Sequence, residues 1–334
     1  DVVFNYGLFS FNTPNFIFRF SLGETDYQLG ATDYERFAAE YAFFGRSVWQ
    51  QTLNLTDEEK TELIRLLQEN YRPENRVYRY NFFYDNCATR PRDKIEESIA
   101  GKVIYPAEPQ DGSLTFRDIV HQYCKGHPWA RFGIDLCIGS EADQPITQRQ
   151  MMFAPFYLMD AFDGAQIKGD SIQRPLITAN ELVVDATPEP DESDWMPTPL
   201  QCSLLLFILS AAATIYGIRR RTGLWGIDLF LFGIAGIVGC VLAFLALFSQ
   251  HPAVNSNFLL LVFHPGQLLF LPYIIYCVRK GKKCWYLTLN LAVLTLFIVL
   301  FPVIPQRFDF AVVPLALVLL IRSASNLIVT SKKK

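Results

Sequence analysis

The residue whose type and position most clearly suggest catalytic chemistry is a cysteine at the junction between a strand-like and a helix-like segment. The aromatic, alternating run 76–83 leads into YDNCATRPRD, in which Cys87 is followed by a helical pattern. Asn86 is a suitable helix N-cap, and Pro91 is tolerated only in a first helical turn. A thiol at a helix start faces unpaired N–H groups and the positive end of the helix dipole. We therefore expect a lowered pKa for Cys87 and a nucleophilic thiolate.

Polar neighbours of Cys87 could support this chemistry. Arg90 and Arg92 add positive charge, and the helix-start amides could hold the oxyanion formed when a carbonyl is attacked. A buried structural cysteine is the competing interpretation, and the polar surroundings argue against it. The supporting residues could also do no more than cap the helix. They are Asp85, Asn86, Arg90 and Asp93.

A second polar group lies in the apolar half of the chain. Polar residues near or within membrane segments are functional candidates by default, although solvation of a loop explains His251 equally well. His121 and His127, earlier in the chain, are weaker candidates for a catalytic base. The candidates for a substrate-facing role are His251, Asn255, Asn257 and His264.

The cysteine pattern gives no support to a metal site. None of the seven cysteines forms a CxxC pair or a zinc-like spacing, so we expect neither a metal nor a cofactor. Three of them, Cys87, Cys124 and Cys137, precede the apolar half. Three is an odd number, so at least one of these is expected to be a free thiol.

Charge and hydropathy divide the chain in two. Hydrophobic residues make up 51% of it, and mean hydropathy is +0.17. Twelve of the 30 Lys and Arg residues but only two of the 33 Asp and Glu residues lie from Leu200 onward, which leaves a net charge of −13 before it. An acidic water-exposed half argues against a nucleic-acid partner, whose binding requires a basic surface.

The apolar half predicts about five membrane-spanning helices, each close to the ~20 residues that cross a bilayer. Arg322 interrupts the last one and is expected to snorkel toward the interface. Basic clusters follow the first, third and fifth spans, whereas the opposite loops contain only Arg307. The positive-inside rule then places the N-terminal half outside the cytoplasm and the C-terminus inside. The expected spans are 200–218, 225–248, 258–278, 285–304 and 310–329.

The preceding segment, 186–199, combines four prolines with four acidic residues and is expected to be an extended linker. The predicted division is therefore a domain at 1–185, a linker at 186–199 and a membrane domain at 200–334. The first domain is predicted to be α+β, with strands within 2–30 (Phe16, Phe18 and Phe20 alternating) and at 76–83. A capping box of Thr56 and Glu59 predicts a helix to about residue 70. Further helices are expected at 33–50, after Pro91, at 116–124 and at 151–162.

Several segments resemble the Bacteroidota lipoprotein N-acyltransferase family, whose periplasmic domain is a circularly permuted, papain-like (NlpC/P60-type) fold. The segments are NYGLFSF, PNFIFRFSLG, YQLG, LNLT, PENRVYRYNFFYDNCATRPRD and HPAVNSN, spread over almost the whole chain. The resemblance implies that Cys87 is the nucleophile. It also implies a catalytic histidine ahead of the NYG strand, upstream of Asp1, so that the chain is expected to be truncated at its N-terminus.

The resemblance implies acyl transfer at the outer face of the bacterial inner membrane. A membrane lipid would donate an acyl chain to Cys87 as a thioester, and the α-amine of a lipoprotein's N-terminal cysteine would accept it. Two alternatives stay open. One is a membrane-anchored cysteine peptidase or amidase acting on cell-wall peptides, and the other is a non-enzymatic membrane scaffold with an inert cysteine.

Overall fold

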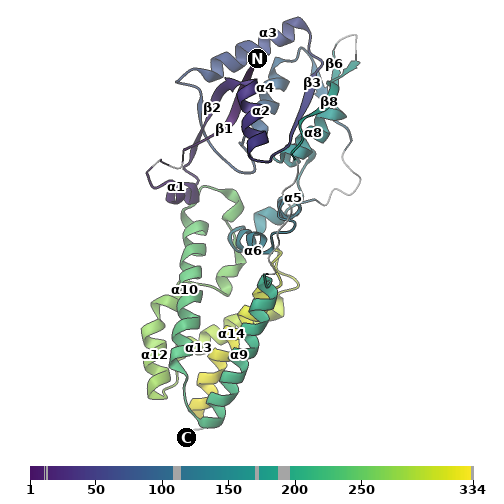
Figure 1. The fold of residues 1–334 in the computed structure, drawn as a ribbon. Coiled ribbons are helices and arrows are strands. Elements are labelled where there is room, and N and C mark those ends of the chain that lie inside the picture. Colours follow the sequence, from purple (N-terminus) through teal and green to yellow (C-terminus); the bar gives the residue numbers. More distant parts are fainter. Residues whose placement is uncertain (11, 13, 108–113, 170–172, 187–195, 332–334) are drawn as a thin grey trace. The chain divides into compact units, whose positions relative to one another are not determined.

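The chain folds into two compact units, seen in a computed structural model (Figure 1) that describes residues 1–334 except 11, 13, 108–113, 170–172, 187–195 and 332–334. The first unit comprises Asp1–Ile119 and Pro145–Asp194, and the second comprises Val120–Gln144 and Trp195–Lys334. The chain thus leaves the first unit at residue 120 and returns at 145, an excursion that the sequence did not indicate. Most of the expected linker lies outside the described residues.

The first unit contains mixed α and β structure, with its described strands in three small antiparallel sheets of order β1-β2-β4, β3-β8 and β5-β6-β7. In the first sheet, Val2 pairs with Asp33 and Asn5 with Gly30, and the register then shifts before Leu8. The strands are β1 Val2–Leu8, β2 Asp26–Asp33, β3 Val48–Leu53, β4 Val77–Arg79, β5 Lys102–Ile104, β6 Gln166–Lys168, β7 Gln173–Pro175 and β8 Ile177–Val184.

Helices pack against these sheets. The predicted capping box is confirmed, because Thr56 and Glu59 exchange side-chain to backbone hydrogen bonds at the start of α3. Helix α5 carries the chain from the first unit into the second. The helices of this half are α1 Phe16–Leu22, α2 Tyr34–Phe43, α3 Asp57–Tyr71, α4 Thr89–Ser98, α5 Phe116–Tyr123, α7 Gln148–Met151 and α8 Pro155–Asp163.

Several predicted elements differ. The alternating Phe16, Phe18 and Phe20 lie in helix α1, not in a strand, because left-handed residues at Asn15 and Gly23 delimit one short helix. The predicted helix 33–50 ends at Phe43 and is followed by β3, and the predicted strand 76–83 is only β4. The predicted helix 151–162 is two helices, since Pro155 begins α8.

Among the described residues of the first unit, two apolar clusters stand out. One, around Leu55, Ile99 and Leu176, fills the space between α3, α4 and the strands near the C-terminal end of this unit. The other is rich in tyrosine and lies against β1, β2 and β4, where Tyr6, Tyr78 and Tyr80 are buried with Leu29. This tyrosine-rich cluster is the one that adjoins Cys87.

The second unit is helical. Helices α9 and α14 lie side by side, and α13 packs against α14 (Figure 1). A buried apolar core runs through the helices of this unit and includes Phe232, Leu259 and Phe297. The helices, with 3-10 helices marked η, are α6 Pro128–Cys137, η1 Ser140–Asp143, α9 Pro199–Arg220, α10 Trp225–Phe248, η2 Pro252–Val254, η3 Phe258–Leu261, α11 Gly266–Leu269, α12 Leu271–Lys280, α13 Trp285–Leu300 and α14 Val312–Ser331.

Within the described residues, three helices are long and apolar enough to cross a membrane: α9, α10 and α14. A fourth span results if α12 and α13, bent by 111° relative to each other, count as one. The expected third span, 258–278, is divided into η3, α11 and α12. Two prolines interrupt the helical backbone hydrogen bonding of this segment. One is in Pro265-Gly266, at the start of α11, and the other is Pro272, at the start of α12. The structure therefore describes three to four apolar helices of membrane-spanning character.

Arg322 does not snorkel. It is 2% exposed, its Nε donates to Asp228 on α10 at 2.7 Å, and its Nη1 donates to Thr214 on α9 at 2.9 Å. The prediction was wrong because the charge has an internal partner, which a single helix pattern does not reveal. A buried pair of this kind ties α9, α10 and α14 together, and losing either member leaves an uncompensated charge.

The excursion 120–144 is bonded to the loops between the apolar helices. Asp143 on η1 pairs with Arg307 at 3.0 Å, and Gly139 N donates to Ala253 O at 2.7 Å. Gln306 donates to the carbonyl of Ile138 at 3.2 Å. Helix α6 and η1 therefore belong to the core of the second unit.

Candidate functional site

Cys87 lies between β4 and α4, just after a closed turn. Asn81 and Asp85 exchange backbone hydrogen bonds of 2.8 and 3.0 Å, which fold residues 81–85 into a tight loop. The loop is held from outside by aromatic packing, since Phe83 stacks on Phe116 at 4.2 Å and meets Phe153 edge-on at 5.1 Å. Cys87 follows two residues after this loop and two residues before the first residue of α4.

Asn86 fixes the backbone on either side of the thiol. Its side chain is buried, and its Oδ1 accepts from the amides of Ala88 (2.8 Å) and Thr89 (3.0 Å). Its Nδ2 donates to the carbonyls of Phe82 and Phe153, both at 2.9 Å. The N-cap position of α4 is Ala88 and not Asn86 as predicted, so the helix begins two residues later than expected. Because Asn86 occupies these two amides, they are not available to an oxyanion as the sequence analysis expected.

Arg90 and Asp85 form one rigid pair beside the cysteine. Arg90 donates through Nε and Nη2 to the two carboxylate oxygens of Asp85, each at 2.7 Å. The guanidinium also lies 3.8 Å from the centre of the Tyr78 ring, and Tyr78 in turn donates to the carbonyl of Tyr6. The charge of Arg90 is thus largely balanced by Asp85, which limits its influence on the thiol.

The thiol is exposed, yet aromatic groups crowd it. Burial raises the pKa of Tyr27, Tyr78 and Tyr80, and a charge on Cys87 raises each of them further, so all three rings lie within electrostatic reach of the sulfur. On the other side, a side chain added at Gly7 of β1 would touch Cys87 Cβ at 3.7 Å. Gly7 therefore lies next to the Cys87 side chain.

The expected lowering of the thiol pKa is not what the structure gives. Partial desolvation raises the pKa of Cys87, and a hydrogen bond from its own backbone N–H opposes this only in part. The sequence argument counted the helix dipole and Arg90. It missed that Asn86 covers the helix start, that Asp85 neutralises Arg90 and that tyrosines displace water. The thiol therefore needs a base to become nucleophilic.

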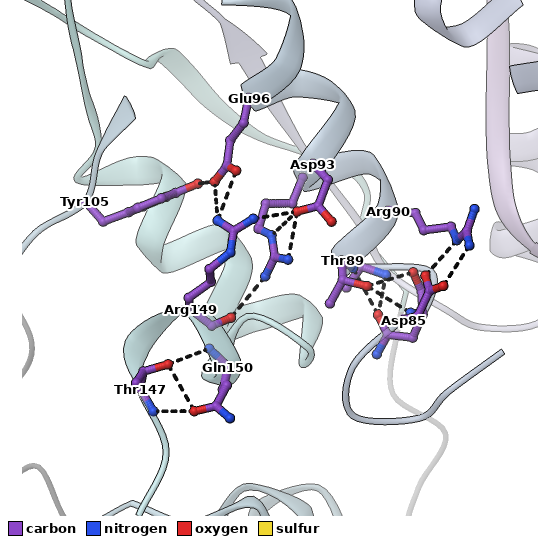
Figure 2. A network of polar contacts seen from close by, with 12 residues as sticks. Asp85, Thr89, Arg90, Asp93, Glu96, Tyr105, Thr147, Arg149 and Gln150 are labelled. Carbon is purple, nitrogen blue, oxygen red and sulfur yellow. Dashed lines mark hydrogen bonds and ion pairs between the residues drawn. The ribbon is translucent and has the colours of Figure 1, made fainter. Parts of the chain in front are cut away.

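Asp93 belongs to a separate polar network on the far end of the first turn of α4 (Figure 2). It pairs with Arg149 at 2.7 Å and with Arg92, whose Nη1 donates to the carbonyl of Arg149 at 3.0 Å. Arg149 also pairs with Glu96 at 2.8 Å, and Tyr105 donates to Glu96. Figure 2 shows Asp85 and Arg90 apart from this group, so the structure does not bring Asp93 to the thiol.

Of the candidate residues in the second unit, one is buried and has a structural role, and the other three are exposed or half-buried. Asn257 is buried, donates to the carbonyl of Leu136 at 2.8 Å and accepts from Leu259 N, so it fastens α6 to η3. Asn255 is exposed and His251 is half-buried in the same loop. His264 is half-buried, and its Nε2 lies 3.2 Å from Asn290 Oδ1.

Sequence reasoning missed the residues that shape the surroundings of the thiol. Tyr27, Tyr78 and Tyr80 come from β2 and from the end of β4, and only strand pairing brings them together. The alternation in RVYRY was the available signal, since it places Tyr78 and Tyr80 on one face. Among the described residues, no group of three or more His, Cys, Asp or Glu could hold a metal ion.

A cavity of about 240 Å³ lies against the same strand that carries Gly7. Asn5 and Leu8 of β1 line it, together with α2 residues that include Arg36 and Glu40. The cavity and the thiol therefore share β1 as a common wall.

These features define a class: a membrane protein with an α/β water-exposed unit that carries one open thiol at a helix start. Two family models match the chain, the Lnb N-terminal periplasmic domain over residues 1–121 and the Lnb transmembrane domain over residues 191–334. The chain belongs to the Lnb family. It is accordingly an inner-membrane protein with a periplasmic N-terminal domain, and membership indicates a membrane-associated enzyme that modifies lipoproteins. No curated protein and no solved structure matches it.

Proposed function

We propose that the protein is a cysteine-dependent lipoprotein N-acyltransferase with Cys87 as its nucleophile. The observation that carries the proposal is an exposed cysteine on a rigid backbone: Asn86 fixes the chain on both sides of Cys87, which is exposed. A nucleophile needs both properties, access for the substrate and a fixed line of attack. A cysteine that served only packing would be buried.

In the proposed first half-reaction, the Cys87 thiol gives its proton to a base, and the sulfur attacks the ester carbonyl carbon of a membrane lipid. The ester C–O bond breaks, the lipid's alkoxide leaves as an alcohol after taking up a proton, and a thioester remains on Cys87. The backbone N–H of Cys87, which stabilises the thiolate, is the proposed donor for the oxyanion.

In the second half-reaction, the α-amine of a lipoprotein's N-terminal cysteine attacks the thioester carbonyl. An amide bond forms, the C–S bond breaks, and the thiol is regenerated. No cofactor takes part. Both substrates are held in a bilayer, so a membrane-anchored enzyme meets them at a high effective concentration.

The base is part of the proposal. All four histidines of the sequence belong to the second unit, and the first unit, which carries Cys87, has none within 1–119 or 145–194. The resemblance to the acyltransferase family assigns this role to a histidine ahead of the NYG strand. Because the thiol pKa is raised, the acylation rate must depend steeply on whichever group takes the proton.

The finer architecture also belongs to the proposal. We propose a permuted papain-like arrangement for residues 1–185, a linker at 186–199 and five spans within 200–334. The C-terminus is proposed to be cytoplasmic. By the positive-inside rule the basic clusters at Arg219–Arg221 and Arg279–Lys283 lie in cytoplasmic loops, and the chain ends on the same side of the membrane as these loops. Asp85, Asn86 and Arg90 are proposed to position Cys87, and His251, Asn255 and His264 to face the lipid substrates.

The test is to reconstitute the full chain in vesicles that contain phospholipid with a radiolabelled acyl chain. The proposal expects a label on the protein that hydroxylamine removes, as it does a thioester, and that Cys87→Ser abolishes. Cys124→Ser is the matched control, because it removes another thiol that is not buried.

Three outcomes would contradict the proposal. Label retained in Cys87→Ser would place the acyl group elsewhere. Release of cell-wall peptide fragments without any label would indicate a peptidase or amidase instead. Unchanged lipoprotein N-acylation in cells that carry only the Cys87→Ser gene would indicate a non-enzymatic role.

A further inference from the structure

Helix α1 is short, apolar and lies wholly on the surface of the first unit. Its sequence is FIFRFSL, and none of its residues is buried. Ile17 is 80% exposed and Phe18 is 55% exposed. Its single charged residue, Arg19, reaches back to donate to the carbonyl of Glu24 at 3.1 Å and pairs with Asp26 at 3.4 Å. The outward side of the helix is therefore apolar, and its one charge is balanced.

A series of stacked aromatic rings leads from this helix to the thiol site. Phe20 stacks on Phe16 at 6.2 Å, and Phe16 stacks on Phe9 at 5.5 Å. Phe9 stacks on Tyr27 at 4.7 Å, and Tyr27 stacks on Tyr80 at 4.0 Å. Tyr27 and Tyr80 are two of the three tyrosines around Cys87, so the series joins an exposed apolar helix to the sulfur.

We propose that α1 inserts its apolar side into the bilayer surface and that the ring series Phe20–Phe16–Phe9–Tyr27–Tyr80 guides a lipid acyl chain from the bilayer to Cys87. The first part stands on the exposure of α1. The second part rests on the proposed acyltransferase function.

A lipid surface is the occupant that the chain itself favours. Within α5 the polypeptide passes directly from Ile119 of the first unit to Val120 of the unit that holds the apolar helices, so the first unit is permanently tethered to a membrane protein. Exposed side chains such as Ile17 and Phe18 are unfavourable in water and favourable at a hydrocarbon boundary. Rings stacked on one another present a row of apolar edges along which an acyl chain can lie.

Membrane contact is tested by photocrosslinking in vesicles. The full chain carries the photoreactive residue p-benzoylphenylalanine in place of Phe18 or, as control, in place of Ile64 on α3, which is equally exposed at 54%. The proposal expects phospholipid adducts from position 18 at least about tenfold above position 64. Equal adduct yields, or a crosslink from position 18 to a second copy of the chain, would overturn it.

The guiding role is tested with Phe16→Asp combined with Phe20→Asp, the two α1 rings of the series, against Ile64→Asp. Burial of one large apolar side chain shifts an equilibrium by about ten- to hundredfold, so acyl loading of Cys87 from vesicle phospholipid should fall at least about tenfold in the α1 variant. Alkylation of Cys87 by water-soluble iodoacetamide should be unchanged, which shows that the thiol site is intact.

The two proposals can fail separately. Lipid adducts at position 18 without acyl loading of the unsubstituted protein would contradict the acyltransferase function and leave the membrane contact standing. Normal acyl loading in the α1 variant would contradict the guiding role and leave the acyltransferase function standing.

Discussion

Replacing Asn86 by alanine tests whether its four hydrogen bonds hold the backbone around the thiol. The change leaves the amides of Ala88 and Thr89 without their acceptor, and both residues are at least 95% buried. The carbonyls of Phe82 and Phe153 lose a donor. A buried amide left unsatisfied costs about 1–3 kcal/mol, so we expect the two amides together to cost about 2–6 kcal/mol of unfolding free energy.

In a unit of this size, 1 kcal/mol corresponds to a shift in melting temperature of roughly 2–4 °C. Asn86→Ala should therefore lower the melting temperature of the first unit by roughly 4–24 °C, measured by circular dichroism of the full chain in detergent. Asn86→Asp keeps the acceptor but sets an anionic oxygen against two carbonyls, so it should be destabilising as well.

The matched control is Asn180→Ala. Asn180 is exposed and donates one hydrogen bond, to Asp163 at 2.6 Å. Such surface changes stay within about 0.5 kcal/mol. A melting temperature for Asn86→Ala no lower than that of Asn180→Ala would refute the reasoning, because Asn86 would then be dispensable to the turn.

Three further outcomes follow from the charged and titrating groups. Burial alone would raise the pKa of Glu59, but hydrogen bonds from Thr56 and Arg174 outweigh it and lower the pKa. The ionised Glu59 carboxylate stabilises the folded state at pH values above its unfolded-state pKa. This stabilisation is lost as the pH falls through the lowered folded-state pKa. The melting temperature should therefore fall more steeply from pH 5 to 3 than in Glu59→Gln, and parallel curves would contradict this. Because burial raises the pKa of Cys87, its iodoacetamide alkylation should have a pH midpoint above the ordinary value of about 8.5; a midpoint below 7.5 would restore the helix-dipole argument. Arg322→Gln should destabilise the helical unit by about 3–5 kcal/mol and the double variant with Asp228→Asn by less. Unfolding of the helical unit is followed on heating by the reaction of its buried cysteines with a thiol-reactive dye. If the destabilisation of the double variant equalled the sum of the two single-variant effects, the pairing of Arg322 with Asp228 would be excluded.

The features that sequence predicted well depend on neighbours in the chain. The capping box of Thr56 and Glu59, and the apolar runs that became α9 and α10, are each complete within one segment. The placement of Cys87 before a helix was equally local, since Pro91 falls in the first turn of α4. Patterns of this kind are readable because the interacting groups are a few residues apart.

The features that sequence did not predict come from distant segments. The pKa of Cys87 is raised by burial, and that burial comes from tertiary packing, which also pairs Tyr27 of β2 with Tyr78 of β4. The partner of Arg322 lies 94 residues away on another helix. The aromatic alternation at Phe16 matched a strand, but no neighbouring strand was available to it, and Asn15 and Gly23 delimited a helix. The pKa, ion pairs and secondary structure of these residues depend on partners far away in the sequence. A single sequence does not identify those partners.

The excursion of residues 120–144 imposes an order on biosynthesis. Helix α6 and η1 are synthesised before α9, yet Asn257 and Gln306 donate hydrogen bonds to the backbone carbonyls of this early segment. The segment must therefore wait, incompletely bonded, until the last membrane helices have been inserted. Splitting the gene at the Pro-rich stretch 186–199 would separate these partners, so co-expressed halves would regain stability only by reassembling across the cut.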